Sequence, residues 1–223
     1  MTDTFFVTAT GTDLGKTYVL CRILQQLRER GVAVVAVKPV LSGFEDALAR
    51  ESDAGQILLA MGQPADMQSV AAIAPWRFRA PLSPDMAAAR EGQVVRLDDV
   101  SRFCREALNR AGGIAFVEGA GGVLSPLGND FTNLDLLQAL GAAGLVVAGG
   151  YLGTISHTLT AISAMQARGC APVAIVLSGV QDGPVPLAET AATIARFTDV
   201  PIHIVDRGGR VPDALLDLLQ LKV

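Results

Sequence analysis

The pattern of apolar and polar residues predicts short buried strands that alternate with amphipathic helices. Six runs are apolar almost throughout, which is typical of strands covered on both faces. These predicted strands are residues 4–8, 32–37, 114–117, 145–148, 173–177 and 202–205. Between them apolar residues recur at helical spacing, and the predicted helices are residues 16–30, 97–110, 133–140, 154–168, 187–197 and 212–219.

This alternation indicates an α/β fold, with a doubly wound, mainly parallel sheet and helices on both of its faces. The chain has 223 residues and is 50% hydrophobic, which is enough for one sizeable core, so we predict a single domain over residues 1–223. Residues 40–95 show no clear strand, although helical spacing occurs at 53–61 and 84–90. A long insertion after a strand is typical of a functional loop region.

The exit of the first strand carries the most informative motif of the chain. Residues 10–17 read TGTDLGKT and lie between a predicted strand and a predicted helix. Backbone N–H groups and a helix N-terminus meet there, which suits a polyanion, and the segment is interpreted as a phosphate-binding loop. We expect Lys16 to reach the β- and γ-phosphates of a nucleotide and the Thr17 hydroxyl to ligate Mg²⁺. Compared with the spacing G-x-x-x-x-G-K-[ST], Thr10 stands where the first glycine belongs.

Lysine is scarce in this chain, since only Lys16, Lys38 and Lys222 are lysines among 18 basic residues. An ammonium is a compact charge and a guanidinium a planar fork, so a lysine kept among arginines suggests a need for the compact charge. Lys38 ends the second predicted strand, close to Ser42, and is expected beside the phosphate-binding loop. The alternative is a solvated strand terminus, which is how we interpret Lys222.

Acidic residues follow two further segments. Glu118 ends an apolar strand before several glycines, and a buried acid at that place needs a cation, so it is interpreted as a Mg²⁺ ligand. Asp53 could be a second ligand or a residue of a helix cap. The segment 153–157 opens a helix whose free N–H groups suit a carboxylate or a phosphate. His157 stays open between packing and a site role, and His203 in an apolar strand is interpreted as structural.

Charge and hydropathy exclude some classes of partner. The net charge is −4 and the basic residues are scattered, so we expect no nucleic-acid partner. No apolar run reaches the ~20 residues of a membrane helix, and the N-terminus lacks a secretory pattern. We therefore expect a cytoplasmic protein without a membrane partner.

Taken together, these motifs resemble the dethiobiotin synthetase family, whose members are single-domain P-loop NTPases. The chain has GTDLGKT at 11–17, KPVLSG at 38–43, SDA at 52–54, VEGAGG at 117–122 and LGTISH at 152–157. The resemblance covers positions 5 to about 160 and is weak beyond 178. It implies a homodimer with active sites at the interface, ATP as a substrate and Mg²⁺ as the cofactor.

The resemblance also implies a reaction. CO₂ adds to one amine of 7,8-diaminononanoate, ATP phosphorylates the carbamate, and the second amine attacks the carbamic-phosphoric anhydride and closes the ring of dethiobiotin. The implied catalytic residues are Lys16, Lys38 and Thr12. The implied nucleotide-binding residues are Thr12, Asp13, Leu14, Gly15, Lys16, Thr17, Tyr18, Glu118, Gly121 and Ser178. The implied substrate-binding residues are Lys38, Ser42, Gly121, Gly153, Thr154 and Ser156, of which 153–156 come from the partner subunit. The implied Mg²⁺ ligands are Thr17, Asp53 and Glu118.

The chain departs from this family at several positions. Many members have Asn-Asp for reading adenine where this chain has Ser178 and Gly179, so base recognition is expected to be relaxed or supplied elsewhere. Asp85 stands where the family has a histidine near the substrate, and Ser156 stands where asparagine is usual.

Three other classes share the loop. Amide-forming synthetases carry an additional glutamine-hydrolysing domain, for which this chain has no room. Partition and septum-positioning ATPases, which switch as nucleotide-bound dimers, carry an extra lysine near the start of the loop, and residues 9–12 read ATGT here. A nucleotide-binding module without catalysis is the third alternative.

Overall fold

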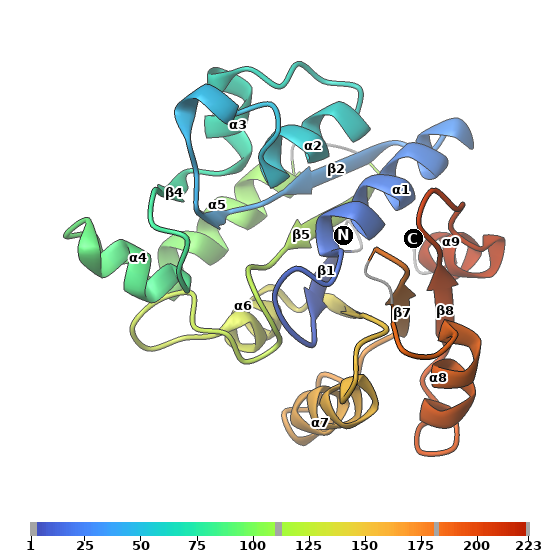
Figure 1. Cartoon of the computed structure of the whole chain (residues 1–223). Coiled ribbons are helices and arrows are strands. Elements are labelled where there is room, and N and C mark those ends of the chain that lie inside the picture. The colour runs from blue at the N-terminus through green and yellow to red at the C-terminus, as the bar shows by residue number, and fades with distance from the viewer. Residues whose placement is uncertain (1–3, 110–112, 181–182, 222–223) are drawn as a thin grey trace.

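A six-stranded parallel sheet forms the centre of the protein (Figure 1). The computed structural model describes residues 4–109, 113–180 and 183–221; the predicted helix end at Arg110 and the prediction for Lys222 lie outside them. The strand order is β2-β5-β1-β6-β7-β8, and every pairing is parallel. The strands are β1 Thr4–Ala9, β2 Val34–Val37, β5 Ile114–Glu118, β6 Ala143–Ala148, β7 Ala174–Ser178 and β8 Ile202–Val205. All six predicted strands are confirmed, with ends that differ by two residues at most.

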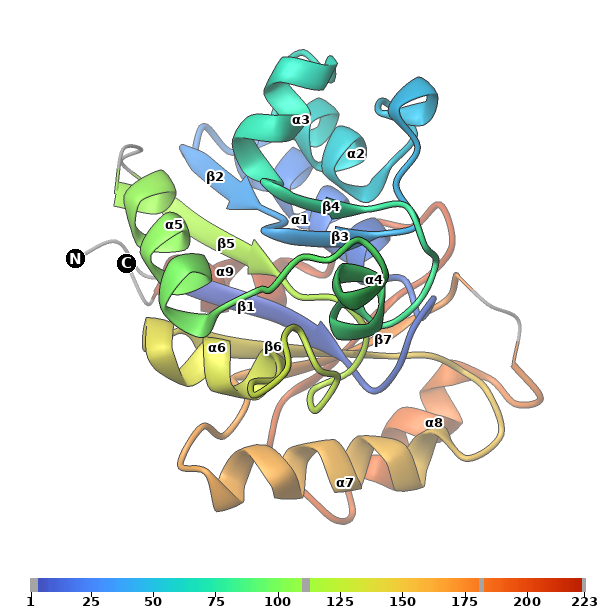
Figure 2. The same ribbon diagram turned by 90° about the vertical axis from the view of Figure 1, so that its left-hand side faces the viewer.

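Helices cover both faces of this sheet, as predicted (Figure 2). Helices α1 and α9 lie behind the sheet in that view, and α5 and α6 lie in front of it. The two helices of the first face are α1 Lys16–Glu29 and α9 Asp213–Gln220. The second face carries α5 Leu97–Asn109, α6 Asn133–Leu140, α7 Thr154–Ala167 and α8 Leu187–Ile194. The doubly wound α/β fold is therefore confirmed.

The long segment after β2 contains more regular structure than the sequence indicates. It holds α2 Asp53–Ala60, α3 Met67–Ile73, α4 Pro84–Arg90 and a short 3₁₀ helix, Asp46–Leu48. The expectation of no strand there is wrong, because β3 Val40–Ser42 and β4 Trp76–Phe78 pair in parallel as a second, two-stranded sheet. Strands of three residues are too short to show a hydrophobic period, which is why the pattern missed them.

The core follows from the apolar composition of the central strands. Every residue of β5 is buried, and so is all of β1 after its first residue. The rings of Phe5 and Phe116 stack across the paired strands, with centroids 5.6 Å apart. Each such ring contributes roughly 1.5–3 kcal/mol when fully buried. The helices of both faces therefore rest on a rigid central layer.

The strand order places several loops at one edge of the sheet. The carboxyl ends of β2, β5 and β1 are neighbours, because β5 pairs with both of the others. In open parallel sheets ligands bind at this edge, where the loops diverge.

Among the helices of residues 4–109, 113–180 and 183–221, none has the length and apolar character that a membrane-spanning helix needs.

His203 on the edge strand β8 generates a prediction about acid stability. Its Nε2 atom is buried and has no hydrogen-bond partner among the described residues, and burial lowers the pKa of the imidazole below its usual value of 6.5. The unfolded chain takes up a proton as the pH falls through about 6.5, whereas the folded protein resists it. The contribution of His203 to the free energy of unfolding should therefore be constant above that pH and fall between pH 6.5 and 5.

Denaturant titrations of wild type and His203→Gln at pH 7.5, 6 and 5 would check this. The variant should lose less stability over that range. Asp66 does not interfere with this test, because the Ser69 N–H holds its pKa below the usual value. The contribution of Asp66 to stability is therefore lost only at still lower pH. Equal acid sensitivity of both proteins would contradict the prediction.

Candidate active site

The loop between β1 and α1 is a turn that depends on left-handed backbone. Asp13 has φ 57° and Gly15 has φ 89°, directly before α1 begins at Lys16. A Cβ atom at Gly15 would lie 2.4 Å from the Ser178 hydroxyl, so glycine is required there both by its conformation and by the space. No side chain caps α1, which leaves its first N–H groups available to a ligand.

A cavity of about 370 Å³ lies between this loop and the ends of β2 and β5. Most of the predicted nucleotide-binding and catalytic residues line it. Its walls are Thr12, Asp13, Gly15, Lys16, Thr17, Tyr18, Lys38, Leu41, Ser42, Asp53, Ala120, Gly121 and Val180. The structure therefore brings together residues that are as far apart in the sequence as 12 and 180.

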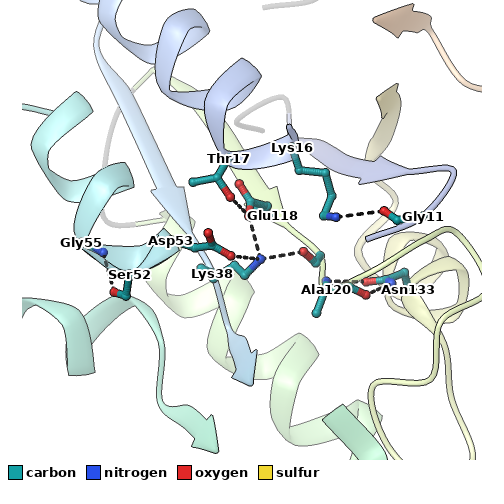
Figure 3. A network of polar contacts seen from close by, with 11 residues as sticks. Gly11, Lys16, Thr17, Lys38, Ser52, Asp53, Gly55, Glu118, Ala120 and Asn133 are labelled. Atoms are coloured by element: carbon teal, nitrogen blue, oxygen red, sulfur yellow. Dashed lines mark hydrogen bonds and ion pairs between the residues drawn. The ribbon is translucent and has the colours of Figure 1, made fainter. Parts of the chain in front are cut away.

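A buried cluster of charges forms the floor of the site (Figure 3). The Lys38 ammonium lies 2.7 Å from Glu118 Oε1 and 3.1 Å from Asp53 Oδ2, and it donates to the Gly119 carbonyl at 3.0 Å. Lys38 is 2% exposed and Glu118 is fully buried. Burial by itself would lower the pKa of Lys38, but the two carboxylates outweigh it and raise the pKa above its usual value. Lys38 is thus not a solvated strand terminus.

Lys16 has a different environment from Lys38. Its ammonium donates to the Gly11 carbonyl at 3.3 Å, and among the described residues it forms no ion pair. Burial, followed by repulsion from Lys38, lowers the pKa of Lys16 to about 8. The carboxylates of Glu118, Asp53 and Asp13 offset this lowering only in part, so the Lys16 charge at the cavity wall is suited to an anionic ligand.

The acidic groups of the site fit a magnesium ion that accompanies a phosphate. Glu118 Oε2 is buried without a hydrogen-bond partner among the described residues. The Thr17 hydroxyl donates to Glu118 Oε1 at 2.8 Å and keeps lone pairs for a cation. Asp53 lies at the first position of α2, where Ser52 is the N-cap, and its side chain is 43% exposed. Two carboxylates and a hydroxyl are hard oxygen donors, as Mg²⁺ requires.

Asn133 is a site-shaping residue that the sequence reasoning missed. Its amide donates to the carbonyls of Ala120 and Gly122, both at 2.7 Å, and accepts from the Ala120 N–H at 3.2 Å. The side chain is 1% exposed and is held at the start of α6 by a capping box of Thr132 and Asp135. Asn133 therefore sets the course of the loop after β5. The capping pattern at 132–135 was the available signal.

The end of the cavity near Tyr18 differs from the expectation for Ser178. Ser178 is fully buried beneath Gly15 and does not line the cavity, whereas Tyr18 and Val180 do. The Tyr18 hydroxyl donates to the Asp206 carbonyl and accepts from the Gly208 N–H. The loop after β8 is thereby fastened to α1 beside this end of the cavity.

Within one chain, the N-terminus of α7 does not reach this cavity. Gly153 and Ser156 line a separate surface pocket instead, and Thr154 is buried with its hydroxyl bonded to the Gly149 carbonyl. Leu14, Glu118 and Ser178 are likewise absent from the cavity wall, although Glu118 contacts residues that line it. The other predicted residues converge.

Comparisons with known proteins agree with these features. The family model described as an AAA domain matches residues 3–212. The ATP-dependent dethiobiotin synthetase of Caulobacter sp. (strain K31) is 47% identical over 95% of this chain and 93% of its own length. The enzymes of the same name from Acidiphilium cryptum and Methylobacterium nodulans are 45% and 41% identical, over 91% and 97% of this chain and 92% and 98% of their own lengths.

Solved structures of low identity share the fold alone. A ParA family ATPase from Chlorobium tepidum superimposes with a TM-score of 0.52 at 15% identity, covering 98% of this chain and 88% of that one. Chloroplast FtsY from Physcomitrella patens gives 0.53 at 16% identity, and the match covers 98% of this chain but 65% of the FtsY chain.

The buried ion pair generates a prediction about stability. Lys38→Met leaves Glu118 buried without its cation, which should lower the free energy of unfolding by about 3–5 kcal/mol. Adding Glu118→Gln should recover part of that loss, because the unpaired charge is then gone. The exposed pair of Arg102 and Asp99, at 2.6 Å, is the matched control, and Arg102→Met should cost about 0–1 kcal/mol. Urea denaturation measures all four proteins, and equal costs for Lys38→Met and Arg102→Met would refute the prediction.

Proposed function

We propose a reaction for this chain on the premise that it belongs to the family of ATP-dependent dethiobiotin synthetases. Its relatives of that name are 41–47% identical over nearly their whole lengths. The chain is accordingly an ATP-dependent ligase of biotin synthesis with a P-loop NTPase fold. The finer proposal is that it joins CO₂ to 7,8-diaminononanoate and closes the ring of dethiobiotin, through residues 1–223 acting as one domain.

One observation carries the proposal for the site. Two lysines, Lys16 at the start of α1 and Lys38 directly after β2, line a single cavity together with Thr17 and Asp53. The reaction accumulates negative charge on a carbamate, a γ-phosphoryl group and a mixed anhydride. A cavity lined by two ammonium groups offsets the mutual repulsion of these anions.

The first steps use the two lysines differently. The neutral first amine attacks CO₂, which forms a carbamate and releases a proton. The amides at the start of α1 and the Lys16 ammonium bind the β- and γ-phosphates of ATP, while Thr12 lies at the cavity wall beside them. Lys38 holds the carbamate oxygen in line with the γ-phosphorus, since positioning contributes most to phosphoryl transfer. The carbamate oxygen then takes the phosphoryl group, and ADP leaves.

The last step forms the second C–N bond. The other amine attacks the carbonyl carbon of the anhydride, the C–O bond to phosphate breaks, and the amine loses its proton. Ser42 and Gly121 line the same cavity and are proposed to bind the diamine portion of the substrate. Asp13, Gly15 and Tyr18 are proposed to contact the nucleotide, with Leu14 and Ser178 supporting the loop from beneath.

Mg²⁺ would be held by Thr17, Asp53 and Glu118, and when bound it neutralises phosphate charge. The buried, unpartnered Oε2 atom of Glu118 supports this assignment. Burial raises the pKa of Glu118 above its usual value, and the Lys38 ammonium, which donates to Oε1 of the same carboxylate, opposes that rise.

The substrate carboxylate is proposed to bind at the N-terminus of α7 from a partner subunit. Gly153, Thr154 and Ser156 are the residues concerned. These residues do not line the cavity of their own chain, which supports a contribution across a homodimer interface. In such a dimer each chain would bind the phosphates in its own cavity and the substrate carboxylate in the cavity of its partner. The cytoplasm is the proposed location. The ParA-like alternative has only a likeness of fold in its favour, at 15% identity.

A direct assay tests this proposal. Purified protein is incubated with ATP, Mg²⁺, bicarbonate and 7,8-diaminononanoate, and phosphate release is followed. Release should depend on the diamine, and dethiobiotin should form in equal amount. Phosphate release that ignores the diamine would favour a nucleotide-switched ATPase, and ATP binding without turnover would favour a binding module.

Removal of the Lys16 ammonium is the second prediction on the reaction. Lys16→Ala should lower kcat by about a hundredfold or more, because an electrostatic contact to developing charge is worth ~3–4 kcal/mol. Initial rates of phosphate release at saturating ATP measure this. Near-normal turnover of the variant would refute the assignment of the loop.

The acidic ligands predict a change in magnesium dependence. Glu118→Gln should raise the Mg²⁺ concentration needed for half-maximal rate, since hard cations depend on oxygen donors of high charge. Asp53→Asn should act in the same direction. Rates measured over a magnesium titration at constant ATP would test both variants. An unchanged midpoint for Glu118→Gln would mean that Glu118 is not a ligand of the ion.

Base discrimination is expected to be weak. Ser178 is buried and Gly179 has no side chain, so neither supplies an amide to the nucleobase. A site rejects the wrong base when its own polar groups are left buried and unpaired by that base. A site that lacks such groups therefore discriminates little between bases. The ratios of kcat/KM for ATP, GTP and CTP at one Mg²⁺ concentration test this. A preference for ATP above roughly a thousandfold would mean that another segment reads adenine.

A further inference from the structure

A chain of three polar side chains fastens the phosphate-binding loop to α7. The hydroxyls of Thr10 and Tyr151 lie 3.3 Å apart, and the Tyr151 hydroxyl lies 2.8 Å from Nδ1 of His157. The rings of Tyr151 and His157 have centroids 5.6 Å apart, inclined by 44°. These contacts join three segments, namely the start of the loop, the turn after β6 and the first turn of α7.

Thr10 occupies an unusual position for such a side chain. It stands where the common spacing of the motif has glycine, so this chain carries a hydroxyl at the entrance of the loop. The Thr10 N–H donates to the Val147 carbonyl at 2.9 Å, which continues the pairing of β1 with β6 by one residue. The backbone and the side chain of Thr10 are thus both held by the β6 side of the sheet.

The turn after β6 packs directly against the loop. A Cβ atom at Gly149 would lie 3.2 Å from Leu14 Cδ2 and 3.3 Å from the Tyr151 ring, so this turn approaches the loop closely only because residue 149 is glycine. Leu14 is 5% exposed. Tyr151 therefore contacts the loop through its hydroxyl, and its backbone segment supports the loop from the side.

The hydroxyl of Tyr151 couples its two neighbours. It has one proton, so it can donate to either Thr10 or His157, and the other neighbour must then donate to it or lose the bond. When His157 Nδ1 accepts, the Thr10 hydroxyl has to donate to Tyr151. His157 consequently orients Tyr151, and Tyr151 orients Thr10, although among the described residues no hydrogen bond joins His157 to the loop directly.

We infer that Tyr151 is a positioning residue that holds the phosphate-binding loop in its receptive form, and that His157 orients it. This inference rests on the proposed binding of nucleotide phosphates by that loop. A loop already in the bound conformation loses less entropy when the ligand arrives, which strengthens binding. Loss of the Tyr151 hydrogen bonds should therefore weaken nucleotide affinity more than it slows the chemical step.

Calorimetric titration of the full-length protein with ADP and Mg²⁺, without the diamine, tests this. Tyr151→Phe keeps the ring and removes both hydrogen bonds, so the Kd for ADP should rise about two- to tenfold, the range for one or two hydrogen bonds. In steady-state assays the KM for ATP should rise more than kcat falls. His157→Ala should weaken ADP binding in the same way, and His157→Asn, whose amide oxygen can replace Nδ1, should restore it.

A double-mutant cycle separates positioning from general damage. Thr10→Val should weaken ADP binding in the wild-type background and add little in Tyr151→Phe, because the shared bond is already absent. The control is Thr160→Val, which should leave the Kd unchanged. Thr160 lines the same pocket as His157 but takes no part in the hydrogen bonds of Tyr151. Thermal unfolding of every variant is measured alongside.

Three results would contradict the inference, and they can be distinguished. If wild type binds ADP and Tyr151→Phe binds it equally well, or loses thermal stability alone, then Tyr151 is a structural residue and the proposed function stands. If wild type binds no ADP at all, the assignment of residues 10–17 as a phosphate-binding loop is wrong, and both proposals fail. Multiplicative effects of Thr10→Val and Tyr151→Phe would also contradict the inference, since independent residues do not share a bond.

Discussion

The buried ion pair of Lys38 and Glu118 is the interaction on which the site depends. Removing both charges from water costs several kcal/mol per ion, so the pair is tolerated only with good geometry and further partners. The register supplies that geometry: Val37 lies opposite Val117 in the parallel pair of β2 and β5. Lys38, the first residue after β2, therefore lies beside Glu118, the last residue of β5. A shift by one residue would turn one of the two side chains to the other face.

The same pair explains why two lysines at one cavity behave differently. Lys38 is neutralised by Glu118 and by Asp53, and its pKa is raised above the usual value. Lys16 forms no ion pair among the described residues, and burial with the nearby Lys38 charge lowers its pKa to about 8. The Lys38 ammonium is therefore held by the acidic groups that it organises. The Lys16 ammonium lines the cavity and donates to the Gly11 carbonyl, and the ligand proposed for it is a phosphate.

The supports around the loop come from distant parts of the chain. Asn133 holds the turn after β5, Tyr151 contacts the loop entrance, and Ser178 lies beneath Gly15. The capping pattern at 132–135 places Asn133 at a helix start, but the contact that each of the three residues makes depends on which strand ends are neighbours. Ser178 is an example: the family resemblance implied that it contacts a nucleotide, yet in the structure it is buried beneath Gly15 and does not line the cavity.

The sequence by itself determined the elements whose signal is local. Apolar runs marked all six strands of the main sheet, and residues 10–17 marked the loop, because periodicity and turn chemistry act over a few residues. Only the tertiary structure decided the short strands β3 and β4, the pairing of Lys38 with Glu118, and the contacts of Asn133 and Tyr151. The physical reason is that strand order and register bring together residues far apart in the chain, and the burial that follows sets their charges and partners.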